Sequence, residues 1–157
     1  MSDLKYPIVG TEQDIIIKEN VLEHILEYRQ LNTNDTEAGG QLFCSFEQSS
    51  VIISLATGPK EKDIRSRFRF IPNRLIERRE IKKMHKAGMH FVGDWHTHPQ
   101  AYPKPSIEDV GSMTDLYVRS EHQLGGMVML IVGQADPPEG LHLSVCNSKS
   151  CIELWSI

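Results

Sequence analysis

The sequence lacks the apolar segments that direct a protein into or across a membrane. No apolar run approaches the roughly 18 residues that a membrane-spanning helix needs. The opening segment, MSDLKYPIVG, has no apolar core of the kind found in signal peptides. We therefore expect a cytoplasmic protein that does not act at a membrane.

Cysteine is scarce, and its spacing matches no common motif. The chain has three cysteines, Cys44, Cys146 and Cys151, and no Cys-x-x-Cys pair. An odd number without such a pair predicts neither a disulfide framework nor a zinc site built from thiolates. The same usage agrees with a reducing compartment, which again indicates the cytoplasm.

The sequence also lacks internal repeats, low-complexity tracts and an excess of positive charge. Its 157 residues suit a single domain, 1–157, that can bury a sizeable core. The hydrophobic fraction of 39% and the charged fraction of 24% are those of an ordinary globular protein. The net charge of −4 argues against nucleic acid as the main partner.

The hydrophobic pattern predicts strands and helices mixed along the chain. Residues 125–133, GGMVMLIVG, are almost wholly apolar, as in a strand that is buried on both faces. The other predicted strands are 13–19, a hairpin over 39–58, 66–72, 89–98, 140–146 and 151–157. The predicted helices lie within 18–32, between Asn73 and Gly88, and from Ser106 to near Gly125. This order predicts an α/β (α+β) fold with a central mixed β-sheet flanked by helices.

Two histidines, His96 and His98, stand at the end of the predicted strand 89–98. Pro99 follows them and cannot extend a strand ladder. Side chains at positions i and i+2 of a strand project from the same face, so the two imidazoles point together. Two imidazoles on one face can hold a divalent metal, most often zinc. A third ligand must come from elsewhere in the chain. A His-x-His pair alone is common by chance and is therefore a weak signal.

Asp109 is the candidate for that third ligand. Ser106 is a good N-cap, which places Asp109 in the first turn of the predicted helix. The loop between His98 and Ser106 is stiffened by three prolines and can fold the helix start back over the strand end. Two histidines and one carboxylate leave the fourth position of a tetrahedral zinc open, which is the arrangement of catalytic sites.

The same residues also have a purely structural interpretation. Ser106 followed by Asp109 is a helix-capping pattern, because an acid in the first turn interacts favourably with the helix dipole. The two interpretations are compatible, since a helix start also stabilises an anion or a developing oxyanion. The joint spacing of His96, His98, Ser106 and Asp109 favours the metal site.

A metal site of this type needs a general acid/base that takes a proton from water and gives it to a leaving amine. Glu37 is the better candidate, because it precedes Ala38, Gly39 and Gly40, where glycine permits close backbone approach before a strand. Taken alone, Glu37 would be a solvated loop acid. Asp94 is the rival, two residues before His96 on the same strand face, and could instead be the hydrogen-bond partner of that histidine.

Together these residues resemble the motif of the JAMM (also MPN+ or JAB) zinc metalloprotease family. That motif places a glutamate before a strand, then His-x-His-Pro, and then Ser-x-x-Asp at a helix start. Glu37, His96, His98, Ser106 and Asp109 match every functional position, and EAGGQL at 37–42 is typical of the glutamate segment. The resemblance implies the cytidine-deaminase-like fold of this family.

The resemblance also implies roles for the five residues. His96, His98 and Asp109 would hold Zn²⁺, Glu37 would be the acid/base that activates water, and Ser106 would help to stabilise the oxyanion. Family members typically cleave isopeptide or peptide bonds that follow the C-terminal glycine of ubiquitin or a ubiquitin-like protein. The expected partner is therefore a protein with an extended C-terminal tail. We expect the chain to bind neither nucleic acid nor a membrane.

Size and overall likeness make the chain most similar to the stand-alone prokaryotic branch of the family. Within that branch it resembles the JAB peptidases of bacterial CBASS antiphage operons, which remove a cGAS-like nucleotidyltransferase from the proteins to which it is conjugated. Two other functions stay open: a peptidase that processes a ubiquitin-like sulfur carrier, and a non-catalytic scaffold of the same fold. Nucleotide deamination is disfavoured, because its Cys-x-x-Cys zinc ligands are missing.

Some surface features remain ambiguous at this level. The basic segment Arg78–Lys86 is either a solvated helix face or a contact for an acidic partner. Trp95 and Tyr102 could line a substrate groove, although a tryptophan beside a strand histidine is more often part of the core. An extended substrate tail is best held by addition beside an existing strand edge.

Overall fold

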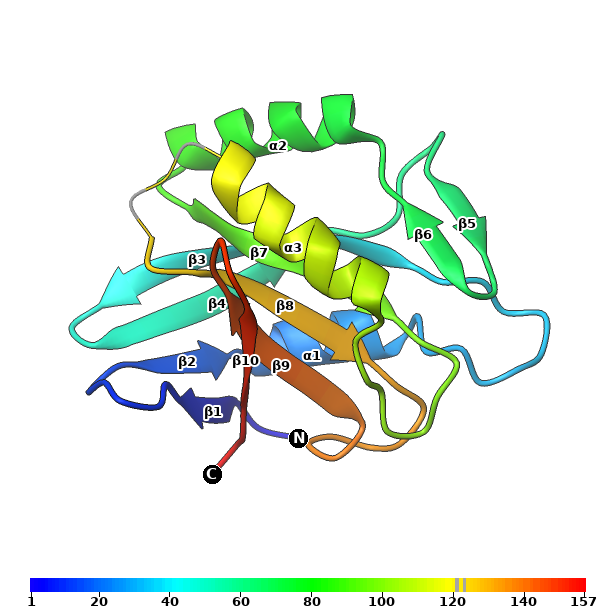
Figure 1. Cartoon of the computed structure of the whole chain (residues 1–157), viewed down its shortest axis with the longest axis horizontal. Helices are drawn as coiled ribbons and strands as arrows, with labels where there is room; N and C mark the ends of the chain where they lie inside the picture. The colour runs from blue at the N-terminus through cyan, green and yellow to red at the C-terminus, as the bar shows by residue number, and fades with distance from the viewer. Residues whose placement is uncertain (121, 123) are drawn as a thin grey trace.

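The computed structural model describes residues 1–120, 122 and 124–157, and it has one large mixed sheet with helices on both faces (Figure 1). The eight strands of this sheet follow the order β1-β2-β4-β3-β7-β8-β9-β10. Their bounds are β1 Leu4–Pro7, β2 Asp14–Ile17, β3 Gly39–Glu47, β4 Ser50–Ala56, β7 His90–Thr97, β8 Met127–Val132, β9 Leu141–Cys146 and β10 Cys151–Leu154. The pairs β2–β4 and β7–β8 are parallel and the others antiparallel, which confirms the predicted mixed sheet.

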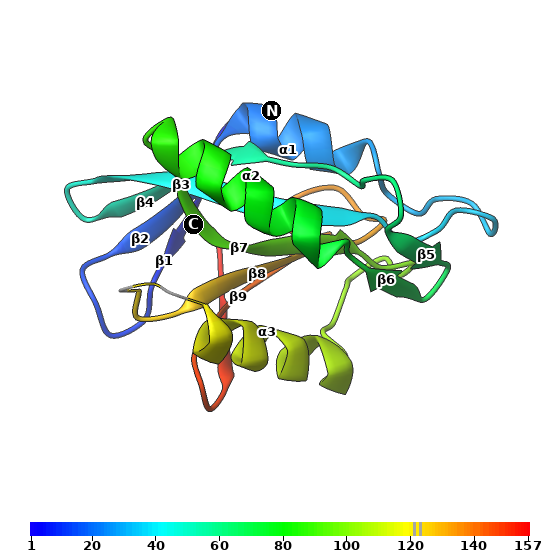
Figure 2. The same cartoon turned by 90° about the horizontal axis from the view of Figure 1, so that it is seen from above.

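Helices lie on both faces of the sheet, α1 (Glu19–Leu26) on one face and α3 (Ile107–Arg119) on the other (Figure 2). The apolar side of α1 packs into the main core with Trp95 and Leu130. Helix α3 packs its Met113 against Met129 and Ile131 on the opposite face of β8. All six residues of β8 are buried, as the continuous apolar run predicts for a strand covered on both faces.

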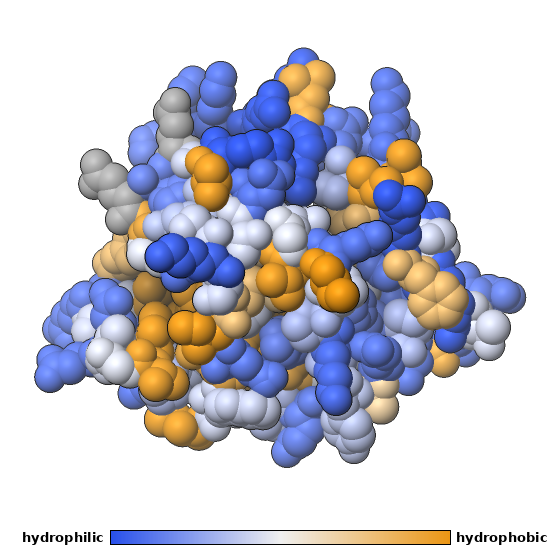
Figure 3. Space-filling model, in the orientation of Figure 1, coloured by the Kyte–Doolittle hydropathy of each residue, from blue (hydrophilic) through white to orange (hydrophobic). Residues whose placement is uncertain are grey.

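Helix α2 (Arg74–Lys86) begins and ends where the sequence predicts. The Asn73 side chain accepts a hydrogen bond from the N–H of Ile76, and Gly88 adopts a left-handed conformation (φ +83°) just beyond the last turn. The basic residues of 78–86 are exposed, and the surface over α2 is mainly hydrophilic (Figure 3). The exposure of these basic side chains agrees with a solvated helix face and also leaves them accessible to an acidic partner.

Two predictions of secondary structure are partly wrong. Residues 66–72 form no single strand but the turn and one arm of a small hairpin, β5 (Ile64–Ser66) and β6 (Arg69–Ile71). Their alternation does not face the core, since Phe68 is 75% exposed. The helix predicted to reach Gly125 ends at Arg119, and its positions 121 and 123 lie outside the described residues. Strand β1 was not predicted.

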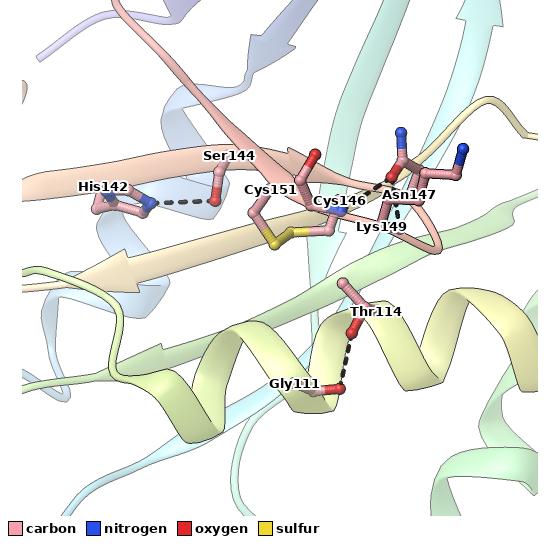
Figure 4. The surroundings of a disulfide bond; sticks show 9 residues. Gly111, Thr114, His142, Ser144, Cys146, Asn147, Lys149 and Cys151 are labelled. Atoms are coloured by element: carbon pink, nitrogen blue, oxygen red, sulfur yellow. Dashed lines mark hydrogen bonds between the residues drawn. A yellow bond between two sulfur atoms is a disulfide. The ribbon is translucent and has the colours of Figure 1, made fainter.

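The expectation that the cysteines form no disulfide is also wrong, because Cys146 and Cys151 are bonded (Figure 4). The two residues close the hairpin between β9 and β10, where the antiparallel register places them directly opposite each other. That register depends on the strands pairing across the four residues 147–150, which the cysteine spacing alone does not reveal. Cys44 is free and buried. Among the described residues, no helix is long and apolar enough to cross a membrane.

Gly93 on β7 pairs with Val128 on β8, and the two backbones leave no room for a side chain at this position. A Cβ atom at Gly93 would lie 1.9 Å from the carbonyl oxygen of Val128, and its φ of +159° disfavours any side chain. We predict that Gly93→Ala lowers the free energy of unfolding by about 2–4 kcal/mol. The matched control is Gly111→Ala in α3, where an added Cβ meets nothing within 4 Å and should stabilise the protein by about 0.5–1 kcal/mol. Urea unfolding measures both; equal stability of the two variants would contradict this packing.

Candidate metal centre

The two histidines meet at the carboxyl end of β7, in the middle of the sheet. His96 is on the strand, and His98 continues its pairing, since the N–H of His98 donates to the carbonyl of Val132 on β8. The Nε2 atoms of His96 and His98 lie 3.1 Å apart, and the rings are tilted at 59°. Thr97 points to the other face and is fully buried. The structure therefore brings the imidazoles together on one face, as their i, i+2 spacing predicts.

The start of α3 brings Asp109 against both imidazoles. Its Oδ1 atom is 3.3 Å from Nε2 of His96, and its Oδ2 atom is 3.2 Å from Nε2 of His98. Burial alone would raise the pKa of Asp109, but hydrogen bonds from the two histidines hold it well below its usual range. Burial alone would lower the pKa of His98, whereas the Asp109 carboxylate raises it above its ordinary value.

Ser106 caps α3 and orients the Asp109 carboxylate. The N–H of Asp109 donates to Oγ of Ser106 at 3.0 Å, and the N–H of Ser106 donates to Oδ2 of Asp109 at 2.8 Å. This is a complete capping box, so the structural interpretation of these residues holds. The capping hydrogen bonds also turn the carboxylate toward the histidines, so the same geometry serves a metal site.

Glu37 approaches from the opposite side, carried by the pairing of β3 with β7. In that antiparallel register Gly39 stands opposite His96, which brings Glu37 beside the histidines. Ligand atoms of Glu37, His96 and His98 all lie within 4.8 Å of one another. Glu37 is only 5% exposed, so it is not a solvated loop acid. Burial raises the pKa of Glu37 to about 6, although His96 and His98 oppose this shift.

The backbone around Glu37 is fixed from several directions. The N–H of Glu37 donates to the carbonyl of Ser66 at 2.7 Å, and Nε of Arg65 donates to the carbonyl of Glu37 at 2.8 Å. The close approach predicted from the glycines is present at Gly40, where a Cβ would lie 2.1 Å from the carbonyl oxygen of Thr57. The β5–β6 hairpin therefore contributes directly to the position of the glutamate.

Asp94 does not bond to His96. Its Oδ2 atom lies 3.5 Å from Nη1 of Arg74, which also binds Glu77 at 2.7 Å, and its Oδ1 atom is buried without a partner. Burial raises the pKa of both carboxyls, to about 7 for Glu77. This group of two acids and one arginine was not predicted, because it depends on α2 packing across β7.

A groove of about 460 Å³ joins these features, with Glu37, His96, His98, Ser106 and Asp109 all on its wall. The β5–β6 hairpin lines one side with Phe68 and Phe70, and α3 contributes Ser112 and Met113. Apolar side chains also gather on the surface over the hairpin, on the right of Figure 3. Trp95 is 1% exposed and donates from Nε1 to the carbonyl of Thr57, so it belongs to the core, while Tyr102 is exposed.

The donor set suits zinc. Bonds of about 2.0–2.1 Å to a tetrahedral zinc place neighbouring ligand atoms about 3.3 Å apart. The three contacts among His96, His98 and Asp109 measure 3.1, 3.3 and 3.2 Å, close to that value. Two imidazoles and one carboxylate, all facing an open groove, leave room for a water or a substrate oxygen as the fourth ligand.

Comparison with known proteins agrees with this geometry. Residues 18–145 match the family described as prokaryotic homologs of the JAB domain. The chain belongs to this prokaryotic JAB family. It is 28% identical over 128 residues to a CD-NTase/cGAS isopeptidase of Escherichia coli (strain TW11681), covering 80% of each chain. It is 30% identical over 141 residues to a protein of the same name from Vibrio cholerae, covering 87% of each.

The fold of this JAB-family chain is also found among solved structures. The solution structure of protein DSY2949 from Desulfitobacterium hafniense superposes with a TM-score of 0.63 at 21% identity, covering 87% of both chains. At that identity the likeness shows the fold alone. It supports the predicted central mixed sheet flanked by helices.

Thr97 links the histidine strand to the glutamate segment and provides a test of the site's framework. Its Oγ1 atom accepts from the N–H of Ala38 at 3.0 Å and donates to Oε1 of Gln30 at 2.8 Å, both buried. We predict that Thr97→Val, which keeps the shape, lowers the free energy of unfolding by about 2–4 kcal/mol, because two buried polar groups lose their partner.

The matched control for this test is Thr33→Val, at an exposed position of the loop before Glu37. It should change the free energy of unfolding by less than about 0.5 kcal/mol. Chemical denaturation measures both variants under the same conditions. If Thr97→Val were as stable as Thr33→Val, the hydrogen bonds of Thr97 would contribute nothing to the free energy of unfolding, and the prediction would be wrong.

Proposed function

We propose that this JAB-family chain is a zinc-dependent isopeptidase. The observation that carries the proposal is the meeting of His96, His98 and Asp109 within 3.1–3.3 Å beside the buried Glu37, on the wall of one groove. The relatives named CD-NTase/cGAS isopeptidase support the same reaction class. We propose that the substrate is a nucleotidyltransferase of this type joined through its C-terminal tail to another protein, as in CBASS antiphage defence, and that the reaction takes place in the cytoplasm.

In this proposal Nε2 of His96, Nε2 of His98 and the Asp109 carboxylate would hold the metal. Bound zinc would supply Lewis acidity, which makes a water more acidic and polarises a carbonyl. The roles of the remaining residues follow from their positions in the groove. The three side chains line the groove together with the β5–β6 hairpin, so a substrate carbonyl that enters along the hairpin can reach them.

Glu37 is the acid/base of the proposed reaction. Its buried carboxyl, with a pKa of about 6, lies close enough to take a proton from an attacking water and is basic enough to do so near neutral pH. The water oxygen bonds to the carbonyl carbon, the C–N bond breaks, and Glu37 passes its proton to the leaving amine. The carboxyl thus returns to its starting state, and the products are a free carboxylate and a free lysine amine.

Ser106 is placed to stabilise the developing oxyanion. Its Oγ atom accepts a hydrogen bond from the N–H of Asp109, so the hydroxyl hydrogen remains available to donate into the groove. A donor aimed at an oxyanion contributes about 2.7–4 kcal/mol to the lowering of a barrier. The start of α3 adds the positive end of its dipole at the same point.

The groove also favours an extended tail. Four consecutive residues, 68–71, line it from β6 and the turn before it. A strand at the edge of a two-stranded hairpin offers backbone donors and acceptors to an added chain. We propose that the substrate tail lies along this hairpin with its terminal carbonyl near the histidines.

Replacement of the acid/base tests the mechanism. We predict that Glu37→Gln lowers cleavage of a conjugated nucleotidyltransferase by at least about 100-fold while the protein keeps its fold and its bound zinc. Glu61→Gln, at an exposed position, is the matched control and should cleave as the unchanged chain does. A chelator should abolish cleavage, and added zinc should restore it.

The same experiment separates the alternatives. Undiminished cleavage by Glu37→Gln would contradict the assigned mechanism. A chain that neither holds zinc nor cleaves any conjugate after zinc is added would instead be a scaffold of the same fold. Cleavage restricted to a ubiquitin-like sulfur carrier would keep the chemistry and change the substrate.

A further inference from the structure

Gln100 lies two residues beyond His98, outside the five-residue motif, and its side-chain oxygen contacts two different groups. Oε1 of Gln100 lies 3.2 Å from Nδ1 of His98 and accepts a hydrogen bond from the N–H of Lys104 at 3.1 Å. Although Gln100 itself is exposed, its contact with His98 is partly buried. This oxygen therefore joins a metal-site histidine to the proline-rich loop that leads to Ser106.

These two contacts together fix which nitrogen of His98 carries the proton. A backbone N–H can only donate, so the side-chain atom that faces Lys104 must be the amide oxygen and not the amide nitrogen. The same oxygen faces Nδ1 of His98 and can only accept from it. Nδ1 must therefore carry a hydrogen. When His98 gives up its other ring hydrogen to bind a metal, the lone pair is on Nε2, the atom that faces His96 and Asp109.

Backbone hydrogen bonds fix the position of Gln100. Its carbonyl accepts from the N–H of Gln134 at 2.8 Å, and the carbonyl of Ala101 accepts from the N–H of Ala135 at 3.1 Å. These bonds tie the loop to the segment that follows β8. Gln100 is thus anchored on the sheet side while its side chain reaches both the histidine and the loop.

We infer that Gln100 is a positioning residue that fixes the tautomer and ring orientation of His98 for metal binding and holds the loop before Ser106 in place. The inference rests on the metal site proposed above. Partners that hold the second nitrogen of a ligand histidine typically contribute 10–100-fold in metal affinity. Gln100 lines the groove, but in this inference it acts through His98, whose Nδ1 it contacts.

Zinc affinity, measured by competition with a chromophoric chelator, tests this role apart from catalysis. We expect Gln100→Leu to weaken zinc binding by about 10–100-fold. Gln100→Glu keeps an oxygen that accepts from both His98 and Lys104, so its affinity should stay within about threefold of the unchanged chain. Gln13→Leu, at an exposed position remote in sequence, is the matched control and should not change the affinity.

Nuclear magnetic resonance of the histidine rings gives a second readout on the unaltered chain, which does not depend on whether a variant folds. In the zinc-loaded, ¹⁵N-labelled protein, the ring hydrogen of His98 should be on Nδ1 and the metal on Nε2. A hydrogen on Nε2, or a Gln100→Leu variant that binds zinc as tightly as Gln13→Leu, would overturn the inference and leave the proposed isopeptidase intact. A wild-type chain that binds no zinc would overturn both.

Discussion

The contact of one carboxylate with two imidazoles is the interaction on which the rest of the proposed site depends. Asp109 reaches His96 and His98 at 3.3 and 3.2 Å only because the start of α3 is folded back over the end of β7. The Ser106 capping box sets the direction of the carboxylate, and the loop before it is tied to the segment after β8 through Gln100 and Ala101. The helix cap, the loop and the strand end thus hold one another in position as one structural unit.

The second constraint is the pairing of β3 with β7, which brings a distant glutamate to this unit. Glu37 and His96 are far apart in sequence, yet Gly39 and His96 stand opposite each other in the sheet. Thr97, turned away from the metal site, holds Ala38 from the other face. The residue between the two histidines therefore has its own role, which is to fix the segment that carries the proposed acid/base. The hairpin that lines the groove holds the same segment through Arg65 and Ser66.

The parts of this arrangement that depend on local periodicity and capping could be predicted from the sequence. The facing of His96 and His98 follows from the two-residue repeat of a strand, and the cap at Ser106 from side-chain chemistry. The glycines after Glu37 made it a candidate, but nothing local distinguishes a buried acid from a solvated one, and its role in the site came from the family resemblance. The contacts of Arg65, Arg74 and Cys146 were out of reach, since each depends on strand register or on helix packing between distant segments. The alternation of apolar and basic residues at 66–72 led to a wrong strand prediction. These residues belong to an exposed hairpin, so their pattern does not reflect packing against a core.

The central claim is that three side chains from a strand end and a helix start hold one metal ion. X-ray absorption at the zinc edge, on protein supplied with one equivalent of zinc, tests it most directly. The account predicts one zinc per chain with only nitrogen and oxygen ligands at about 2.0–2.2 Å, two of them imidazole, and loss of this signal in Asp109→Ala. A chain that takes up no zinc, or a zinc with sulfur at about 2.3 Å, would contradict it.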